Sequence, residues 1–304
     1  MSTTREFRRR IKSVKNIAQI TRAMEAVSAS RVRRAQEQVL ATRPYARLAW
    51  EVLSHLASQP TADGKLHRLL EVRPKVDTVG VVLLTSDRGL CGAFNHNIVR
   101  TTESFIKQLD KPAKLITVGR KGRELMWRRH YDIMAEFSHL PAAPGIVDIA
   151  PIARTAIDAY LSNTVDQVYL AYTVFVNRMR QEPAVKRLLP LRPTKMVDQA
   201  ASAYLVDAHP ERLKVTQYIY EPSPQVILDT ILPRFTVLQI YQAILESLAS
   251  EHSARMVAMR NATDNALSLI DDLTIDYNKA RQQGITSELL DIAGGAEALQ
   301  ASMR

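Results

Sequence analysis

The chain has 304 residues, a length that predicts about two domains, and its 46% hydrophobic and 24% charged residues are typical of a globular protein. No uncharged apolar run approaches the ~18 residues that a membrane span needs, and the N-terminal stretch lacks the apolar region of a secretory signal. A single cysteine, Cys91, excludes an internal disulfide and a cysteine-based zinc site, and it fits a reducing cytoplasm.

The net charge of +10 is concentrated near the N-terminus. Residues 1–47 hold 12 Lys/Arg residues against 3 acidic residues, a net charge of +9, while the rest of the chain is nearly balanced. The basic character therefore belongs to one segment, whose partner has to be explained, and a solvated or protein-facing charged surface is one interpretation of it.

Residues 3–58 predict one long amphipathic helix. They contain no glycine and one proline, Pro44, where we expect a kink because proline has no amide donor. Spacings of three and four dominate the apolar positions, which are Ile11, Val14, Ile17, Met24, Val27, Val32, Ala35, Val39, Ala46, Ala49, Leu53 and Leu56. The helix should end before the turn-forming residues that begin at Gln59.

Residues 76–206 alternate between strand and helix patterns. The strands are predicted at residues 77–84, 114–118, 131–137 and 166–176, and the helices at residues 93–109, 120–129 and 148–161. This alternation favours an α/β domain with a mainly parallel sheet. A polar, proline-bearing stretch, residues 181–224, is expected to lead back to the last helix.

The first strand runs into a glycine-containing turn, residues 86–95. Turns between a strand and a helix often bind phosphate groups, but neither GxGxxG nor GxxxxGK[ST] is present, and a tight turn by itself explains the glycines. A nucleotide site remains an alternative. Cys91 beside His96 could act as a nucleophile, although a buried structural thiol is the favoured interpretation. With no carboxylate pair, triad or metal-ligand spacing, we predict no catalytic, cofactor or metal residues.

Residues 225–304 carry the clearest periodicity in the chain. The predicted seam has spacings of three and four, with one four–four step at His252, which we interpret as a polar interruption. Its members are Leu238, Tyr241, Leu245, Leu248, His252, Met256, Met259, Thr263, Ala266, Ile270, Leu273, Tyr277 and Ala280. Pro233 is expected to interrupt the start of this helix.

Two long seams at opposite ends of one chain bury each other most simply by pairing. The predicted fold is therefore α/β plus coiled coil: a long antiparallel two-helix coiled coil with a Rossmann-like α/β domain inserted between its helices. The predicted domains are residues 1–58, residues 76–206, and residues 207–304 with a foot segment and the last helix.

Two other classes of protein share part of this pattern. A basic coiled-coil scaffold could bind nucleic acid, although few aromatic residues lie in the basic segment for base stacking. A small α/β enzyme with helical extensions is the other alternative.

Four stretches of the chain resemble the gamma subunit of F-type ATP synthases, and the resemblance covers nearly the whole chain. They are residues 8–24, 85–95, 250–265 and 277–296. The last is the most specific, with the pattern Ile285-Thr286-x-Glu288-x-x-Asp291-x-x-x-Gly295-Ala296.

The resemblance implies a non-catalytic central-stalk rotor subunit of a proton-translocating F-type ATP synthase. Such a subunit couples rotation of the membrane c-ring to conformational cycling of the catalytic alpha/beta hexamer, and activity resides in the partner subunits. The implied partners are the alpha, beta and epsilon subunits and the c-ring, with no nucleic acid and no cofactor. The implied location is the cytoplasmic face of the cell membrane, peripheral and within the complex.

The resemblance also implies contact residues. Those expected against the catalytic hexamer are Lys12, Met24, Arg255, Arg281, Gln282, Thr286 and Glu288. Those expected against the c-ring and epsilon subunit are Tyr218, Tyr220 and Glu221. Chloroplast members carry an inserted cysteine pair for redox control, whereas this chain has only Cys91, so we expect no thiol regulation of that kind.

Overall fold

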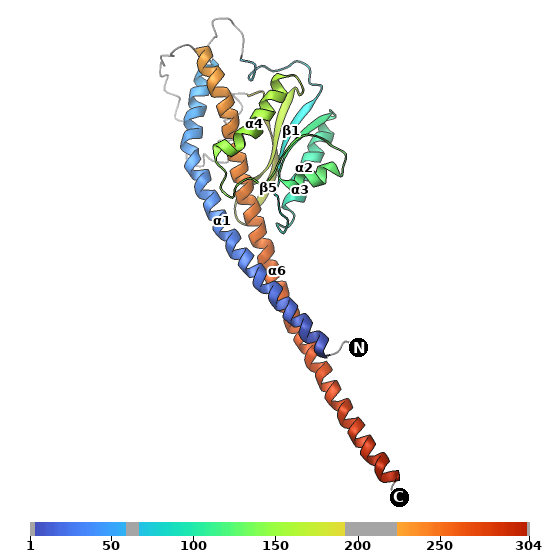
Figure 1. Ribbon diagram of the computed structural model, residues 1–304. Helices are drawn as coiled ribbons and strands as arrows, with labels where there is room; N and C mark the ends of the chain where they lie inside the picture. The colour runs from blue at the N-terminus through green and yellow to red at the C-terminus, as the bar shows by residue number, and fades with distance from the viewer. Residues whose placement is uncertain (1–3, 59–66, 192–223, 303–304) are drawn as a thin grey trace. The chain divides into compact units, whose positions relative to one another are not determined.

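The computed structural model describes residues 4–58, 67–191 and 224–302 (Figure 1). In chain order, the elements are α1 (Thr4–Ser58), β1 (Val79–Leu84), α2 (Phe94–Leu109), β2 (Ala113–Val118), α3 (Arg120–Trp127), β3 (Asp132–Phe137), α4 (Ile146–Leu161), β4 (Gln167–Phe175), β5 (Gln181–Leu189) and α6 (Pro224–Ser302). The predicted fold class, long terminal helices around an inserted α/β domain, is confirmed.

The five strands form one sheet in the order β3-β2-β1-β4-β5. β1 lies in the middle and pairs in parallel with β2 and β4, and β2 pairs in parallel with β3. All six residues of β1 are buried, which explains its continuous apolar run. The carboxyl ends of β1 and β2 therefore lie side by side and lead into the turns before α2 and α3.

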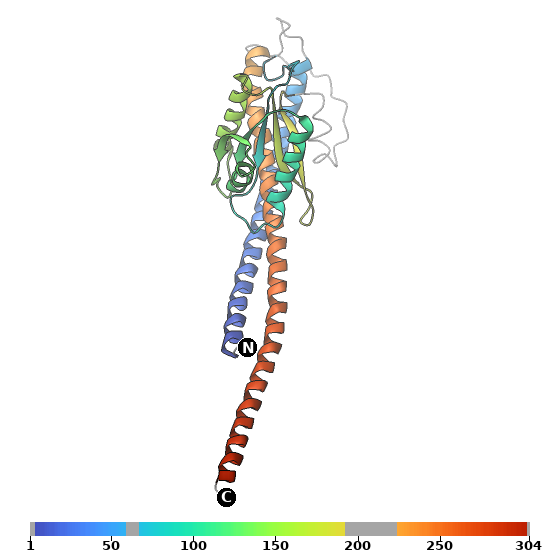
Figure 2. The ribbon, with the colours of Figure 1, turned by 90° about the vertical axis from the view of Figure 1, so that its right-hand side faces the viewer.

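Helices cover both faces of the sheet (Figure 1 and Figure 2). On one face Val82 and Leu84 of β1 join a core with residues of α4 and of the first part of α6. On the other face Val81 and Leu83 join a core with residues of α2 and α3. The strict alternation along β1 thus builds two apolar layers from one strand.

β5 corrects the prediction that residues 181–224 form only a polar connection. Residues 181–189 pair antiparallel with β4, and Pro183 lies opposite Thr173. Proline donates no ladder hydrogen bond, so a strand that contains it belongs at a sheet edge. Glu182, Lys186 and Arg187 interrupt the apolar alternation, and this is why the sequence pattern missed the strand.

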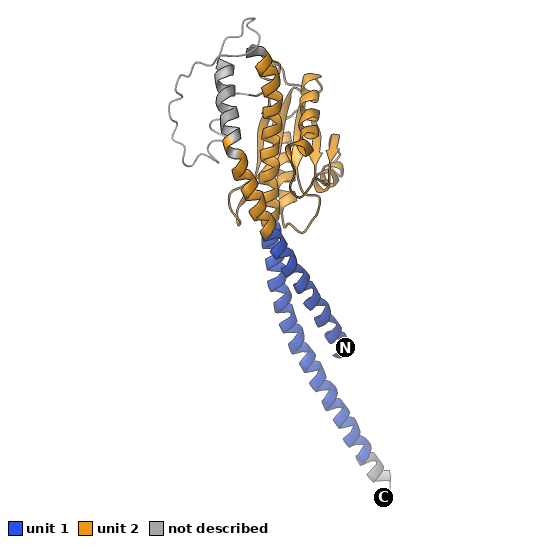
Figure 3. Ribbon diagram, turned by 60° about the vertical axis from the view of Figure 1, so that its left-hand side comes forward, with its two compact units in different colours: residues 1–29, 255–304 blue, residues 30–254 orange. Residues whose placement is uncertain are grey.

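The structure divides into two compact units (Figure 3). The helical unit, residues 1–29 and 255–304, is built from α1 and α6 alone; the sheet unit, residues 30–254, contains the sheet, its covering helices and the remaining parts of α1 and α6. The predicted boundary between residues 206 and 207 lies outside the described residues.

Within the helical unit, α1 and α6 pair antiparallel. The hydroxyls of Thr21 and Thr263 are 2.7 Å apart in the buried seam. Arg8 donates a hydrogen bond of 2.9 Å to the Tyr277 hydroxyl, and its guanidinium lies 5.7 Å from the centre of the Tyr277 ring. Rising residue numbers on α1 thus meet falling numbers on α6.

The seam of α6 follows the prediction, because every predicted position from Leu238 to Ala280 is buried or half-buried. On α1 the prediction is partly wrong, since Ile17 and Val27 are each 52% exposed. The predicted positions Val32 and Ala35 are buried, and nearer the N-terminus the buried residues are Ala18, Thr21 and Ser28. Small side chains continue the three–four spacing from Val14, so the larger apolar residues face outward.

Both prolines of the long helices lie inside continuous helix. α1 continues through Pro44, and α6 through Pro233, so the expected interruption of α6 is wrong. A proline removes one N–H donor, and the backbone bonds on either side continue each helix past it.

Candidate interaction surfaces

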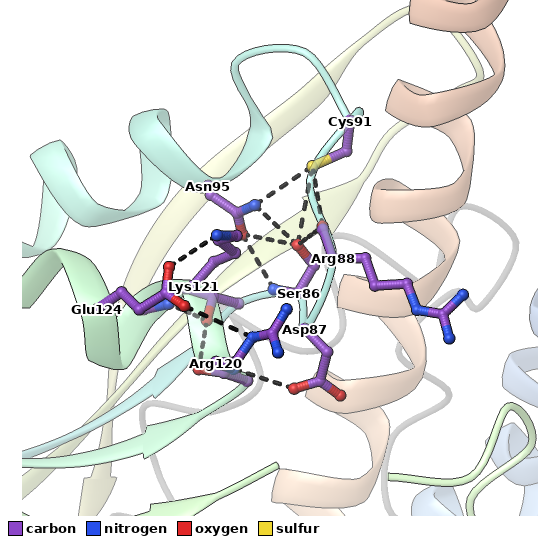
Figure 4. Close-up of polar contacts among 11 residues, drawn as sticks. Ser86, Asp87, Arg88, Cys91, Asn95, Arg120, Lys121 and Glu124 are labelled. Atoms are coloured by element: carbon purple, nitrogen blue, oxygen red, sulfur yellow. Dashed lines mark hydrogen bonds and ion pairs between the residues drawn. The ribbon is translucent and has the colours of Figure 1, made fainter. Parts of the chain in front are cut away.

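The turn after β1 is tied together by its own polar side chains (Figure 4). The Asn95 amide donates to the Ser86 hydroxyl at 2.7 Å, and the Ser86 backbone N–H donates to Asn95 Oδ1 at 3.0 Å. Asp87 reaches in the other direction, because its carboxylate accepts the backbone N–H groups of Arg120 at 3.0 Å and His139 at 2.9 Å. These contacts give the side chains of Ser86, Asp87 and Asn95 a structural role within the turn.

Cys91 is buried in this network, with 2% of its surface exposed. Its sulfur lies 3.3 Å from the Asn95 side-chain nitrogen and 3.8 Å from the Ser86 hydroxyl oxygen. His96, which could have partnered a reactive thiol, is exposed instead. The thiol therefore has the environment of a structural cysteine.

Two glycines let the start of α3 approach the end of β1 closely. Gly119 has a φ of +96°, and a Cβ there would lie 2.2 Å from the Thr85 carbonyl oxygen. A Cβ on Gly122 would lie 2.5 Å from the Thr85 hydroxyl oxygen, which accepts the Gly122 N–H at 2.8 Å. Gly119 and Gly122 thus allow this close packing.

The far end of α6 is exposed over residues 281–296. The exposed side chains include four predicted contact residues, Arg281, Gln282, Thr286 and Glu288. The large apolar residues Ile285, Leu289, Leu290 and Ile292 are exposed beside them. The seam with α1 has ended by Ala280, so this end of α6 is open to another protein.

α1 presents a dense set of cations in the helical unit. The exposed basic residues are Arg5, Arg8, Arg9, Arg10, Lys12, Lys15 and Arg22. Of the predicted contact residues, Lys12 is exposed, Met24 is half-buried, and Arg255 of α6 is 8% exposed. The surface therefore offers positive charge to a partner along α1.

Three outward-facing apolar residues of α1, Ile17, Ile20 and Val27, were not predicted as a surface feature. Their spacing of three and seven places them on one side of the helix. The signal was present in the sequence, because Val14, Thr21 and Ser28 form a strict heptad series that excludes them.

The predicted contact residues Tyr218, Tyr220 and Glu221 lie outside the described residues. In the parts of the chain that the structure describes, no helix is long and apolar enough to cross a membrane. Over those same residues, no group of His, Cys, Asp and Glu side chains could hold a metal ion.

Comparisons with known proteins give consistent matches over nearly the full length of the chain. The protein-family model described as ATP synthase matches residues 3–299. The ATP synthase gamma chain of Roseiflexus castenholzii is 47% identical over 304 residues, which is 98% of this chain and 99% of the relative. The ATP synthase gamma chain of Dehalococcoides mccartyi strain CBDB1 is 46% identical over 299 residues, which is 98% of this chain and all of the relative.

Solved structures share the fold at lower identity. A chain of the Euglena gracilis mitochondrial ATP synthase, in its OSCP/F1/c-ring structure, has a TM-score of 0.67 at 19% identity, covering 99% of this chain and 96% of that one. A chain of the Tetrahymena thermophila central stalk and c-ring structure has a TM-score of 0.58 at 24% identity, covering 80% of this chain and 99% of that one.

Proposed function

The chain belongs to the ATP synthase gamma chain family, and from this premise we propose that it works as a purely mechanical shaft whose partner subunits carry out all the catalysis. As a gamma chain, it is the central-stalk rotor subunit that couples rotation of the c-ring to cycling of the catalytic alpha/beta hexamer. Membership of this family replaces both the nucleic-acid scaffold and the α/β enzyme as interpretations.

The observation that carries the mechanical proposal is the exposed end of α6. Ile285, Leu289 and Ile292 follow a helical spacing of four and three, and each is at least half exposed. Exposed apolar residues in such a stripe favour burial against a partner protein. We place this end of α6 inside the ring of alpha and beta subunits, where an asymmetric helix can turn against surrounding side chains.

The predicted contact residues fit this placement. Arg281, Gln282, Thr286 and Glu288 are on the exposed end of α6, where they would meet loops of the beta subunits. Lys12 and Met24 would meet the beta subunits along α1. Arg255 would contact them only through the small part of its side chain that is exposed. Tyr218, Tyr220 and Glu221 are proposed to contact the c-ring and the epsilon subunit.

The basic side of α1 suggests how the rotor is attracted to its surroundings. Opposite charges on stationary loops would attract it, and this attraction should weaken with salt because the cations are exposed. Replacing Arg9, Lys12 and Lys15 by Gln should lower ATP-driven proton pumping, most visibly at low salt. Unchanged pumping and unchanged salt dependence would contradict this role.

The proposed location is the cytoplasmic face of the cell membrane, where the chain is held through the complex. In inverted vesicles, which expose that face, a protease should cut the chain without detergent, whereas right-side-out vesicles should protect it. The reverse pattern would place it on the other side.

A cysteine cross-link tests the position of α6. Because Cys91 is buried, the variant Leu289→Cys carries one readily accessible thiol among the described residues. In the assembled complex, a thiol cross-linker should join it to an alpha or beta subunit and stop ATP hydrolysis by blocking rotation. Val147→Cys, an exposed position in the sheet unit, is the matched control and should leave hydrolysis intact. Full ATP hydrolysis by complexes cross-linked at residue 289 would refute the proposal that α6 rotates inside the ring.

The non-catalytic role has its own test. The isolated chain should not hydrolyse ATP, and it should co-purify with the alpha and beta subunits. Turnover by the isolated chain, lost when the Ser86 turn is altered, would overturn the proposal.

A further inference from the structure

A row of buried polar residues lies on one side of α6 within the sheet unit. Glu246, Ser250 and Ser253 are separated by four and three positions, so they share one side of the helix. Glu246 is 4% exposed, and both serines are completely buried. Buried polar side chains are costly unless they have partners, so their contacts define their role.

The two serines bind the backbone of the β4–β5 hairpin. The Ser250 hydroxyl donates to the Thr173 carbonyl of β4 at 3.2 Å. The Ser253 hydroxyl donates to the Arg178 carbonyl, in the turn after β4, at 3.0 Å. Both bonds therefore join α6 to the backbone of one segment, residues 173–178.

Lys186, on the core-facing side of β5, lies near enough to Glu246 of α6 for their charges to interact. Lys186 pairs with Leu170 in the ladder, and Leu170 and Leu188 belong to the core that packs on α6. Lys186 Nζ lies 5.4 Å from the centre of the Tyr172 ring. Burial lowers the pKa of Lys186, while the nearby charge of Glu246 acts in the opposite direction. The lysine of β5 and the glutamate of α6 are therefore opposite charges that attract each other within the buried interface.

The core that α6 shares with β4 is apolar. Leu238, Ile240, Ile244 and Leu245 of α6 belong to the core that also holds Leu170 of β4. Hydrophobic contact is non-directional and depends on the area buried. A helix can shift by one turn on such a surface and recover similar contacts, as packed helices do in conformational transitions. Hydrogen bonds and ion pairs have defined geometry and are lost in such a shift.

We propose that Glu246, Ser250 and Ser253, with their partners on β4 and β5, form a polar latch that sets the register of α6 on the sheet and carries force between them. This inference rests on the proposed function, since a rotor must pass torque between its head and its shaft. The apolar core holds α6 against the sheet, and the polar latch prevents α6 from sliding along it.

The test removes the directional contacts and keeps the volume. The variant Lys186→Met/Glu246→Met replaces the charge pair by apolar side chains of similar size, an exchange that commonly leaves stability unchanged or improved. Adding Ser250→Ala and Ser253→Ala removes the whole latch. The matched control is Thr236→Val, because among the described residues the buried Thr236 hydroxyl bonds only a carbonyl of its own helix, at 3.0 Å.

Each variant is assembled into the complete complex in vesicles, and proton uptake per ATP hydrolysed is measured with and without an opposing proton gradient. Each lost directional bond should raise the probability of slip under load about fivefold, the factor that corresponds to about 1 kcal/mol. We expect normal assembly and normal uncoupled hydrolysis, with proton uptake per ATP reduced against the gradient, and wild-type behaviour for Thr236→Val.

Three results are distinguishable. If the wild-type complex pumps and the latch variant pumps equally well against the gradient, the latch is refuted. If Lys186→Met/Glu246→Met fails to assemble or loses stability to urea, the polar pair serves folding and the force-bearing role is also refuted. If the wild-type chain does not support pumping in the complex, the proposed function fails instead.

Discussion

Asp166 holds the segment before β1 onto the sheet, and its replacement by Asn gives the sharpest stability test. Its carboxylate accepts the backbone N–H groups of Asp77 at 2.8 Å and Thr78 at 3.0 Å. It also accepts a 2.8 Å hydrogen bond from the Arg73 guanidinium, and both side chains of this ion pair are less than one-fifth exposed. One carboxylate therefore satisfies three donors.

Asp166→Asn preserves volume and removes the charge. Hydrogen bonds to charged groups contribute about 1.5–3 kcal/mol each. Asn retains one acceptor oxygen, so some bonds survive in weaker form, and Arg73 loses its nearby counter-ion. We expect the free energy of unfolding of the sheet unit to fall by about 2 kcal/mol near neutral pH.

The pH dependence of this loss has a defined sign. Burial by itself would raise the pKa of Asp166, but the amides of Thr78 and Asp77 and the Arg73 guanidinium hold it below its usual range. A carboxyl with a lowered folded-state pKa stabilises the protein above its unfolded pKa of about 3.9. The stabilisation disappears as pH falls through the folded pKa, so wild type and Asp166→Asn should converge in acid.

Urea unfolding of the full chain, followed by circular dichroism from neutral pH into acid, measures this difference. The matched control is Asp77→Asn, because the Asp77 carboxylate makes only a 3.0 Å ion pair with Lys75 in which both groups are mostly exposed. Its loss should change stability by less than about 0.5 kcal/mol. Equal effects of the two substitutions, or a difference that persists in acid, would refute the reasoning.

Three further outcomes are expected. Ile240→Ala, at a fully buried position, should destabilise the protein by about 3 kcal/mol in urea unfolding, whereas Ile285→Ala at an exposed position should cost less than about 0.5 kcal/mol. Gly119→Ala should lower the thermal midpoint because its Cβ would overlap a backbone carbonyl, while Gly89→Ala, with open space around it, should not. Dithiothreitol should not change the activity of the complex, because Cys91 is buried and has no second cysteine to pair with; clear thiol activation would contradict this.

The long seam of α6 was predictable residue by residue, because helix pairing depends on a local repeat that the sequence displays directly. The seam of α1 was less so. Ile17 and Val27 are the more apolar residues, yet Ala18 and Ser28 are the buried ones. Burial in a pair of helices follows position around the helix axis, and hydrophobicity alone cannot report that position when small residues fill the seam.

β5 and the polar latch show a second limit. The strand is held by its ladder with β4, and the row of Glu246, Ser250 and Ser253 has meaning only opposite Lys186 and the hairpin carbonyls. Neither feature depends on a repeat along the chain, so neither could be predicted from a local sequence pattern. The contact residues on α6 were assigned by family resemblance, and periodicity alone would not have found them.

By itself, then, the sequence determined the two long helices, the order of the strands and helices from β1 to β4, and the concentration of charge in residues 1–47, because each depends on neighbours along the chain. The tertiary structure decided which side of α1 is buried, how β5 closes one edge of the sheet, and which polar groups of α6 meet the hairpin. These depend on contacts between residues far apart in sequence, where the energy of an arrangement is set by the partner that folding brings into place.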